Sequence, residues 1–382
     1  MTTIETQPKI SFGTRIHVSP FFNATRRWGY KSYTTYNHMF MPAFFESPEA
    51  DFWKLVNDVT LWDVAGERQV EITGPDAARF VQYLTPRDLS ACKIGQCKYL
   101  LLTDNEGGIL NDPILLKLGD DHFWLSLADS DILFWARGVA IHAGMDVKIG
   151  EPDVSPLQIQ GPKATDVMVA LLGAGIADLA YFRFIQTTLA GAPVIVSRTG
   201  WSGERGYEVF LRDSNYGDAV WETIMEAGEP FKIAPAAPNT IRRIEAGILS
   251  YGADMTIKNN PFEINLERLL DLDQDADFIG KTSLKQIAAE GVRRRLVGLK
   301  LSGSPIISPN IRRWPIIRDG ETVGNVTSAI YSPRMEANLA LAILSVDAAE
   351  LGQELMVETV DGPVTGTVSP LPFHQNMQTA QA

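Results

Sequence analysis

A short pattern that occurs twice limits the folds open to this chain of 382 residues. The first copy is an alternating strand at Gln69–Thr73, followed by a Gly-Pro turn and a helical pattern from Ala77 to Leu84. The second runs from a strand at Leu157–Gln160 through another Gly-Pro turn into a helical pattern from Ala164 to Leu172. Two copies of one supersecondary unit predict internal pseudo-symmetry, with a site between the halves. We therefore expect a strand-rich α+β fold.

The last quarter of the chain has a different pattern, with several strands and little helix. Strands are predicted at Leu296–Leu301, Val323–Ser328, Leu339–Ile343 and Met356–Val360, with Asp-Gly turn signals between them. This favours a small C-terminal β-barrel or sandwich. We expect an N-terminal α+β domain over 1–150 with an aromatic leading segment, a second α+β domain over 151–285, and a β-rich domain over 286–382.

Charge and composition exclude several classes of protein. A net charge of −12 argues against a broad nucleic-acid footprint. The polar start Met1–Ile10 lacks an apolar targeting core, and no apolar run approaches the ~18 residues of a membrane span, so we expect a cytoplasmic protein without a membrane segment. Cys92 and Cys97 lack the second pair of a structural zinc site, and His38 has no second histidine at metal spacing. We expect no metal.

The turn at Gly107–Asp112 carries the first candidate catalytic residues. Asn111 and Asp112 lie just before the apolar run Ile114–Leu116, which reads as a buried strand. A carboxylate held where a turn enters a buried strand is rigid and partly desolvated, which suits a group that directs a proton or a cation. The alternative is an ordinary turn in which either side chain bonds its own backbone.

The loop from Thr199 to Phe210 carries a second candidate site. It has three glycines and Trp201 between two strands, and such a connection allows close approach to a flat ligand. Glu208 falls in an apolar strand, where a carboxylate is costly without a partner. Two partners stay open: the N–H donors of a guanine-like or pterin ring, and a buried arginine.

A third candidate element is the helical pattern from Ile241 to Tyr251, with Gly252 as its end signal. Arg242 and Arg243 lie near its first turns, where the helix dipole does not favour cations. One of them can be held by a ligand or an acidic partner, but for Arg242 we expect a solvated face.

These motifs resemble those of the aminomethyltransferase, or glycine cleavage T-protein, superfamily. The similar segments are Gly107–Asp112, Arg198–Glu208, Arg243–Asp254 and Gly324–Pro333, and they occur in the family's order. Within the superfamily the chain is most similar to tetrahydrofolate-dependent dimethylsulfoniopropionate demethylases, through segments such as Tyr36–Met39, Trp62–Glu71 and Asn260–Glu263. The resemblance implies a three-domain cloverleaf fold around a folate channel.

The resemblance also implies roles for individual residues. Asp112 would act at the reacting centre and Glu208 would bind the pterin. The expected catalytic residues are Asp112 and Asn111, the expected cofactor-binding residues are Tyr99, Glu208, Trp201, Glu204, Arg243 and Tyr251, and the expected substrate-binding residues are Lys31, Tyr36, Trp201 and Phe210. Lys31, Arg68 and Arg205 are unranked candidates for a donor carboxylate.

Three departures concern the methyl donor more than the folate chemistry. Phe210 stands where a tyrosine is expected, Ile264–Leu266 lacks a usual glycine, and Ser202–Gly206 is nearer the T-protein version of its loop.

The implied activity is that of a methyltransferase of one-carbon metabolism. It would move a methyl group from dimethylsulfoniopropionate, or a close small methylated onium compound, to N5 of tetrahydrofolate, giving 5-methyltetrahydrofolate. The alternatives are a folate-dependent N- or O-demethylase, an aminomethyltransferase proper, and a non-catalytic folate-binding protein. The expected partners are the donor and the folate, without nucleic acid, membrane or a lipoyl protein. The oligomeric state stays open, with a homodimer as one alternative.

Overall fold

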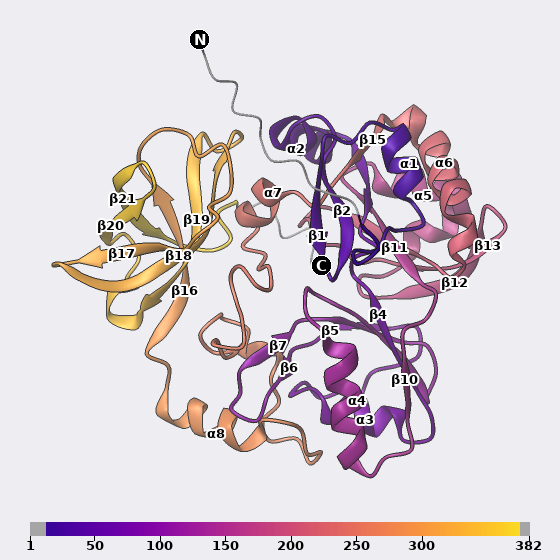
Figure 1. The fold of residues 1–382 in the computed structure, drawn as a ribbon, viewed down its shortest axis with the longest axis horizontal. Coiled ribbons are helices and arrows are strands. Elements are labelled where there is room, and N and C mark those ends of the chain that lie inside the picture. The colour runs from indigo at the N-terminus through magenta and orange to yellow at the C-terminus, as the bar shows by residue number, and fades with distance from the viewer. Residues whose placement is uncertain (1–12, 375–382) are drawn as a thin grey trace.

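A computed structural model of the chain describes residues 13–374, so the ends of the first and last expected domains, with the polar start Met1–Ile10, lie outside the described residues. The described part forms three lobes (Figure 1). Two are built on antiparallel-rich sheets with helices, and the third is a closed β-barrel. The expected α+β fold of the T-protein type, with a small C-terminal barrel, is confirmed.

The chain enters through helix α1 (Phe22–Arg27) and the antiparallel pair β1 (Ser32–Tyr36) and β2 (Met39–Phe44). Helix α2 (Pro48–Asn57) follows. Its start is fixed by Ser47, whose hydroxyl accepts a hydrogen bond from Ala50 N at 3.0 Å.

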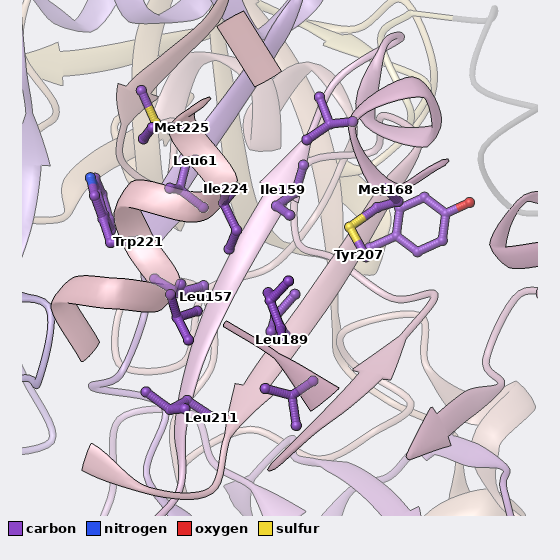
Figure 2. Close-up of a cluster of buried hydrophobic side chains, with 14 of the residues drawn as sticks. Leu61, Leu157, Ile159, Met168, Leu189, Tyr207, Leu211, Trp221, Ile224 and Met225 are labelled. Atoms are coloured by element: carbon purple, nitrogen blue, oxygen red, sulfur yellow. The ribbon is translucent and has the colours of Figure 1, made fainter. Parts of the chain in front are cut away.

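The larger sheet has six strands in the order β12-β13-β14-β11-β3-β15. Helices α5 (Ala164–Leu172) and α6 (Gly217–Gly228) pack over its apolar face, and Figure 2 shows Leu157, Ile159, Trp221 and Ile224 meeting in that core. Sheet membership crosses the boundary expected at residue 150, because β3 pairs with both β11 and β15. The strands are β3 (Val59–Asp63), β11 (Ser155–Gln160), β12 (Phe184–Leu189), β13 (Ala192–Ser197), β14 (Gly206–Leu211) and β15 (Ile233–Ala236).

The second sheet has five strands in the order β10-β4-β9-β8-β5 and is covered by α3 (Ala77–Tyr83) and α4 (Ile132–Ala143). A two-stranded piece, β6 (Leu102–Thr103) with β7 (Ile109–Asn111), lies beside it (Figure 1). The sheet strands are β4 (Gln69–Thr73), β5 (Cys97–Tyr99), β8 (Ile114–Lys117), β9 (His122–Ser126) and β10 (Lys148–Gly150).

The repeated strand, Gly-Pro turn and helix occur in both sheets, as β4 with α3 and as β11 with α5. Gly74 and Gly161, which open the two turns, have φ of 123° and 132°. A Cβ would lie 2.7 Å from Asp146 O at the first and 2.6 Å from Asp58 O at the second. Both turns need glycine because another backbone segment passes against them.

Helix α7 (Thr240–Glu245) is shorter than the sequence pattern predicted. The prediction of a helix reaching Tyr251 is wrong, because the chain leaves the helix at Gly247, which has φ of 65°. The expected solvated face for Arg242 is also wrong: this side chain is buried, and its Nε donates to Glu204 Oε1 at 2.6 Å.

The barrel closes through pairing of β16 with β21, and helix α8 (Lys281–Glu290) precedes it (Figure 1). Its strands are β16 (Arg294–Leu301), β17 (Trp314–Arg318), β18 (Glu321–Ser332), β19 (Ala337–Ser345), β20 (Glu354–Thr359) and β21 (Gly362–Ser369). Short 3₁₀ helices lie in the connections at Ala174–Asp178, Ser214–Tyr216, Glu229–Phe231, Glu267–Leu269 and Val346–Ala348.

Buried hydrogen bonds and an ion pair connect α7 with the barrel and with the segment before it. Arg243 donates to Asp254 Oδ2 at 2.7 Å and to Ser328 Oγ at 2.8 Å, and Ser332 Oγ donates to Glu245 Oε1 at 2.6 Å. Between residues 13 and 374, no helix has the length and apolar character to cross a membrane.

Candidate active site

The candidate site lies where the two sheets meet, because one chain segment passes directly between them. Strand β3 belongs to the six-stranded sheet and β4 to the five-stranded sheet. The link between them, residues 64–68, carries Glu67. Three carboxyl groups come within electrostatic range here: Glu67, Asp112 and Glu208.

Asp112 directly follows β7 and is held by one tyrosine. Tyr99 Oη, at the end of β5, donates to Asp112 Oδ2 at 2.9 Å. The other carboxyl oxygen, Oδ1, is covered and has no hydrogen-bond partner in the described part of the chain. Burial raises the pKa of Asp112 to about 7, because the Tyr99 hydrogen bond offsets only part of the desolvation. Asp112 therefore has an unused acceptor and a pKa suited to taking a proton at neutral pH.

Glu208 lies on β14, directly across from Gln158 on β11. Gln158 Nε2 donates to Glu208 Oε1 at 2.7 Å, while the hydroxyls of Thr199 and Ser197 donate to Oε2. Of the two partners left open by the sequence, a buried arginine is not found among the described residues, since Glu208 forms no ion pair there. Burial raises the pKa of Glu208 above its ordinary value.

Glu67 is a third carboxyl group here, and the sequence predicted no role for it. The same Gln158 Nε2 that donates to Glu208 also lies 3.4 Å from Glu67 Oε1. Burial, then the charges of Glu208 and Asp112, raise the pKa of Glu67 well above its ordinary range. The only signal in the sequence was its place in the segment Trp62–Glu71, whose resemblance assigned it no role.

Aromatic residues expected at the site come from several elements. Burial raises the pKa of Tyr36, at the end of β1, and the charges of Glu67, Asp112 and Asp129 raise it further. Tyr36 packs closely against Gly66, since a Cβ at Gly66 would lie 3.1 Å from Tyr36 O.

Trp201 and Tyr251 complete the group. Trp201 N donates to Gln158 Oε1 at 3.5 Å, and its indole Nε1 donates to Leu249 O at 3.2 Å. Tyr251 Oη donates to Ile109 O at 3.1 Å, and burial and then the charge of Asp112 raise its pKa.

Other expected site residues have structural partners instead. Asn111 is fully buried; its amide nitrogen donates to Ala128 O and Ser130 Oγ, both at 2.9 Å, and its oxygen accepts from Ala128 N. These bonds hold the strand end that carries Asp112, and a catalytic role for Asn111 stays a prediction.

Phe210, an expected substrate-binding residue, also has a structural environment. It is fully buried in an apolar cluster between the two sheets with Leu116, Trp124 and Ile195, and its contact with a donor stays a prediction. Sequence position gave no sign of this, because Phe210 shares its strand face with Glu208.

The charged residues expected at the site divide similarly. Arg243 directs its bonds to Asp254, Ser328 and Ile248 O and lies over the Trp201 ring at 5.7 Å, so it supports Trp201. Glu204 pairs with Arg242. Lys31 is exposed just before β1, and its contact with a donor stays a prediction.

Arg68 and Arg205, the other two candidates for binding a donor carboxylate, have different hydrogen-bond partners. Arg68 pairs with Glu151 and also donates to Asn37 O at 3.4 Å, next to Tyr36. Arg205 donates to Ala177 O at 3.3 Å.

Glu67, Asp112 and Glu208 form a cluster of carboxyl groups that influence one another electrostatically. In residues 13–374, none of Glu67, Asp112 and Glu208 forms an ion pair with a lysine, arginine or histidine. No set of three histidine, cysteine or acidic side chains in that range is arranged to hold a metal ion. A hollow of about 600 Å³ elsewhere, lined by Gln82, Lys117 and Asp271 among others, contains none of the expected site residues. The cluster can therefore accept hydrogen bonds and balance positive charge that a ligand brings.

Two family models match most of the chain. Residues 21–274 match the GCVT N-terminal domain, and residues 294–375 match the glycine cleavage T-protein C-terminal barrel domain. The dimethylsulfoniopropionate demethylase DmdA of Ruegeria pomeroyi is 41% identical over 353 residues, which cover 92% of this chain and 96% of that protein. An aminomethyltransferase of Synechococcus sp. is 34% identical over 351 residues, covering 88% and 92%.

The fold also matches a solved structure. The aminomethyltransferase T of the glycine cleavage system from Bartonella henselae superposes with a TM-score of 0.85 at 22% identity, covering 94% of this chain and 98% of that one. Both domain models match in order and together span most of the described residues. The chain belongs to the glycine cleavage T-protein (aminomethyltransferase) family, whose members use tetrahydrofolate.

Proposed function

We propose that this protein is a demethylase that transfers a methyl group from dimethylsulfoniopropionate, or a close small onium compound, to N5 of tetrahydrofolate. The observation that carries the proposal is the cluster of Glu67, Asp112 and Glu208, which has aromatic neighbours and no cationic partner among the described residues. Such a cluster suits a ligand that brings N–H donors and positive charge together. The 41% identity to a dimethylsulfoniopropionate demethylase over nearly the whole of both chains supports this choice of donor.

The residues present fit a reduced pterin. A carboxylate can accept two N–H groups from the edge of such a ring, and Glu208 is already oriented by Gln158 and Thr199. The free Oδ1 of Asp112 gives a second acceptor. Because the folate would leave carrying the methyl group, it is a second substrate in this scheme.

The chemical step needs little from the protein beyond alignment and charge balance. One C–N bond forms from the lone pair of N5, and one C–S bond breaks with its electron pair staying on sulfur, so the donor leaves as a neutral sulfide. The methylated nitrogen then has one proton too many, and Asp112 accepts it as general base. Burial sets the pKa of Asp112 at about 7, which matches this task.

A second candidate function is aminomethyl transfer, as in the relatives named aminomethyltransferase at 34% identity. The loop Ser202–Gly206, which is nearer the T-protein version, favours it. That reaction needs a lipoyl protein and gives methylene- rather than methyl-tetrahydrofolate. We propose that this chain acts without such a partner, in the cytoplasm, where its unpaired buried Cys92 and Cys97 stay reduced.

A turnover assay with several donors tests the proposal. Purified protein and tetrahydrofolate are mixed separately with dimethylsulfoniopropionate, glycine betaine or dimethylglycine, and folate products are identified by mass spectrometry. We expect 5-methyltetrahydrofolate from the sulfonium compound. Product only from another donor would change the substrate and keep the chemistry. If the protein binds folate but gives no product with any donor, the proposed enzymatic activity is overturned in favour of a folate-binding role.

A further inference from the structure

We propose that Glu67 selects a positively charged methyl donor, by facing the donor's onium centre beside the ring of Tyr36. This inference rests on the proposed methyl transfer and names the residue that would give it charge selectivity. Glu67 belongs to neither of the two strands that flank it but to the link between β3 and β4, so it is presented at the junction of the two sheets.

Glu67 adjoins the two acids proposed to contact the folate. Through Gln158 it adjoins Glu208, the proposed pterin carboxylate, since one amide nitrogen contacts both acids. Its charge also interacts with Asp112, the proposed base, and with Tyr36. A donor that gives its methyl group to N5 must lie next to the base that takes the N5 proton. Glu67 is therefore within reach of both the donor and the folate.

The bonding of Glu67 leaves it in need of a partner. Among the described residues, Glu208 has three neutral donors and Asp112 has Tyr99, whereas the half-buried side chain of Glu67 has only the long contact from Gln158. The adjacent cation Arg68 is paired with Glu151. A carboxylate in this setting gains most from a ligand that carries positive charge.

An onium centre fits these surroundings better than a second set of N–H donors. Sulfonium sulfur and quaternary nitrogen carry charge without hydrogen-bond donors, and proteins hold such groups with aromatic rings and carboxylates. Tyr36 supplies a ring that packs against Gly66, the residue before Glu67, since a Cβ at Gly66 would lie 3.4 Å from Tyr36 Cδ1. As the methyl group moves, positive charge passes from the donor to N5, and a carboxylate that adjoins both sides balances it throughout.

Isosteric pairs of ligands test the charge selectivity directly. Dimethylsulfoniopropionate is compared by calorimetry with 4-methylpentanoate, in which carbon replaces the charged sulfur, with the folate site saturated by 5-methyltetrahydrofolate. We expect the wild-type protein to prefer the sulfonium, and Glu67→Gln to lose this preference by roughly tenfold or more, because a charged contact becomes neutral. Affinity for 4-methylpentanoate and for folate should change less than about twofold.

Two further variants keep the test independent of folding. Glu67→Asp retains the charge and should restore part of the preference. Glu106→Gln, on an exposed turn, is the matched control and should behave as wild type. If Glu67→Gln weakens the binding of dimethylsulfoniopropionate and of 4-methylpentanoate equally, the inference is overturned in favour of a structural role. If it also weakens folate binding, the inference is overturned in favour of a pterin-binding role.

Proton release gives a second readout that a structural role would not produce. The groups that face Glu67 are Glu208 from β14, Asp112 after β7 and Tyr36 from β1, with neutral Gln158 from β11. Because burial and the two acids keep the pKa of Glu67 high, binding an onium ion should release a proton, so donor affinity should rise with pH. The slope should be smaller in Glu67→Gln, and an unchanged slope would contradict the proposal.

Failure of the proposed donor is separable from failure of this inference. If the wild-type protein neither binds nor demethylates dimethylsulfoniopropionate but accepts glycine betaine, the same comparison is made with 3,3-dimethylbutanoate as the neutral isostere. Charge selectivity that depends on Glu67 would support the inference with either donor. Turnover of a neutral methyl donor with no effect of Glu67→Gln would refute it.

Discussion

At the scale of single residues, the proposed function depends on three acids that have no cationic partner in residues 13–374. Asp112, Glu208 and Glu67 come from three separate elements and have neutral hydrogen-bond partners in the described structure. Burial therefore raises the pKa of each, and none is stabilised by a neighbouring arginine or lysine. The proposed substrates supply the missing donors and positive charge.

The proposed role of Asp112 as the proton acceptor gives the first prediction. Asp112→Asn keeps the shape and removes the base, so kcat should fall by about 10²-fold or more while folate affinity changes little. Rapid-quench turnover and calorimetric folate binding measure the two effects. Asp120→Asn, on an exposed turn, should leave both unchanged. Equal losses of turnover and of folate affinity in Asp112→Asn would refute the assignment.

The raised pKa of Asp112 gives a prediction about pH. Only the carboxylate can accept a proton, so kcat/KM should rise as pH passes through about 7, and this rise should be absent in Asp112→Asn. Stability has the opposite sign: the folded protein binds a proton that the unfolded chain loses near the ordinary pKa of 3.8, so this carboxyl's contribution declines as pH rises towards about 7. A pH-independent rate between 6 and 8 would contradict this role.

Glu208 should govern folate binding more than turnover. Glu208→Gln replaces one acceptor oxygen by a donor, and charged hydrogen bonds are worth about 1.5–3 kcal/mol, so folate affinity should fall roughly tenfold to a hundredfold. Quenching of tryptophan fluorescence on titration with tetrahydrofolate measures the change. Unchanged folate affinity in a folded Glu208→Gln protein would exclude Glu208 from the pterin site.

At the scale of elements, the sequence predicted regular structure well where apolar periodicity and turn residues agreed. The strand, Gly-Pro turn and helix of both repeats are present, because pattern and turn chemistry are local properties. The end of α7 was missed because Gly247 stops the helix while the apolar spacing continues to Tyr251. The partners of Arg242, Asn111 and Phe210 could not be predicted, since they depend on segments distant in the chain.

Gly161 gives a prediction at this scale. Its φ is 132°, and a Cβ added to it would lie 2.6 Å from Asp58 O, so Gly161→Ala would strain the turn between β11 and α5. We expect a loss of about 1–3 kcal/mol or more in unfolding free energy, measured by chemical denaturation. Gly150→Ala, where a Cβ meets nothing within 4 Å, is the control and should be nearly neutral. Equal stability of the two variants would refute the need for glycine at this turn.

At the scale of the whole molecule, the lobes are joined by buried polar contacts as well as by apolar packing. The family resemblance predicted the three lobes and the barrel, but sequence patterns did not indicate that β3 would join the six-stranded sheet. That long-range pairing makes the link to β4 pass between the sheets, and this is why Glu67 lies beside Glu208. The site is therefore a product of chain topology.

The contact of Asp254 with Arg243 tests how the barrel is held. Asp254 is fully buried and also accepts from the hydroxyls of Thr327 and Ser328 on β18. Asp254→Ala removes the carboxylate that pairs with the buried guanidinium of Arg243, so we expect a loss of about 3–5 kcal/mol in the free energy of unfolding. Chemical denaturation measures this loss. Asp347→Ala, which breaks the exposed pair with Arg318, is the control and should not shift the transition measurably. Matching transitions for the two variants would show that the barrel does not depend on the buried pair.

The most direct test of the whole account follows an intact methyl group from donor to folate. Dimethylsulfoniopropionate with fully deuterated S-methyl groups is incubated with the enzyme and tetrahydrofolate, and the folate product is weighed by mass spectrometry. We expect 5-methyltetrahydrofolate that carries all three deuterium atoms of one methyl group, together with the singly demethylated sulfide. A methylene-tetrahydrofolate product, or unlabelled folate in the presence of active, folate-binding protein, would contradict it.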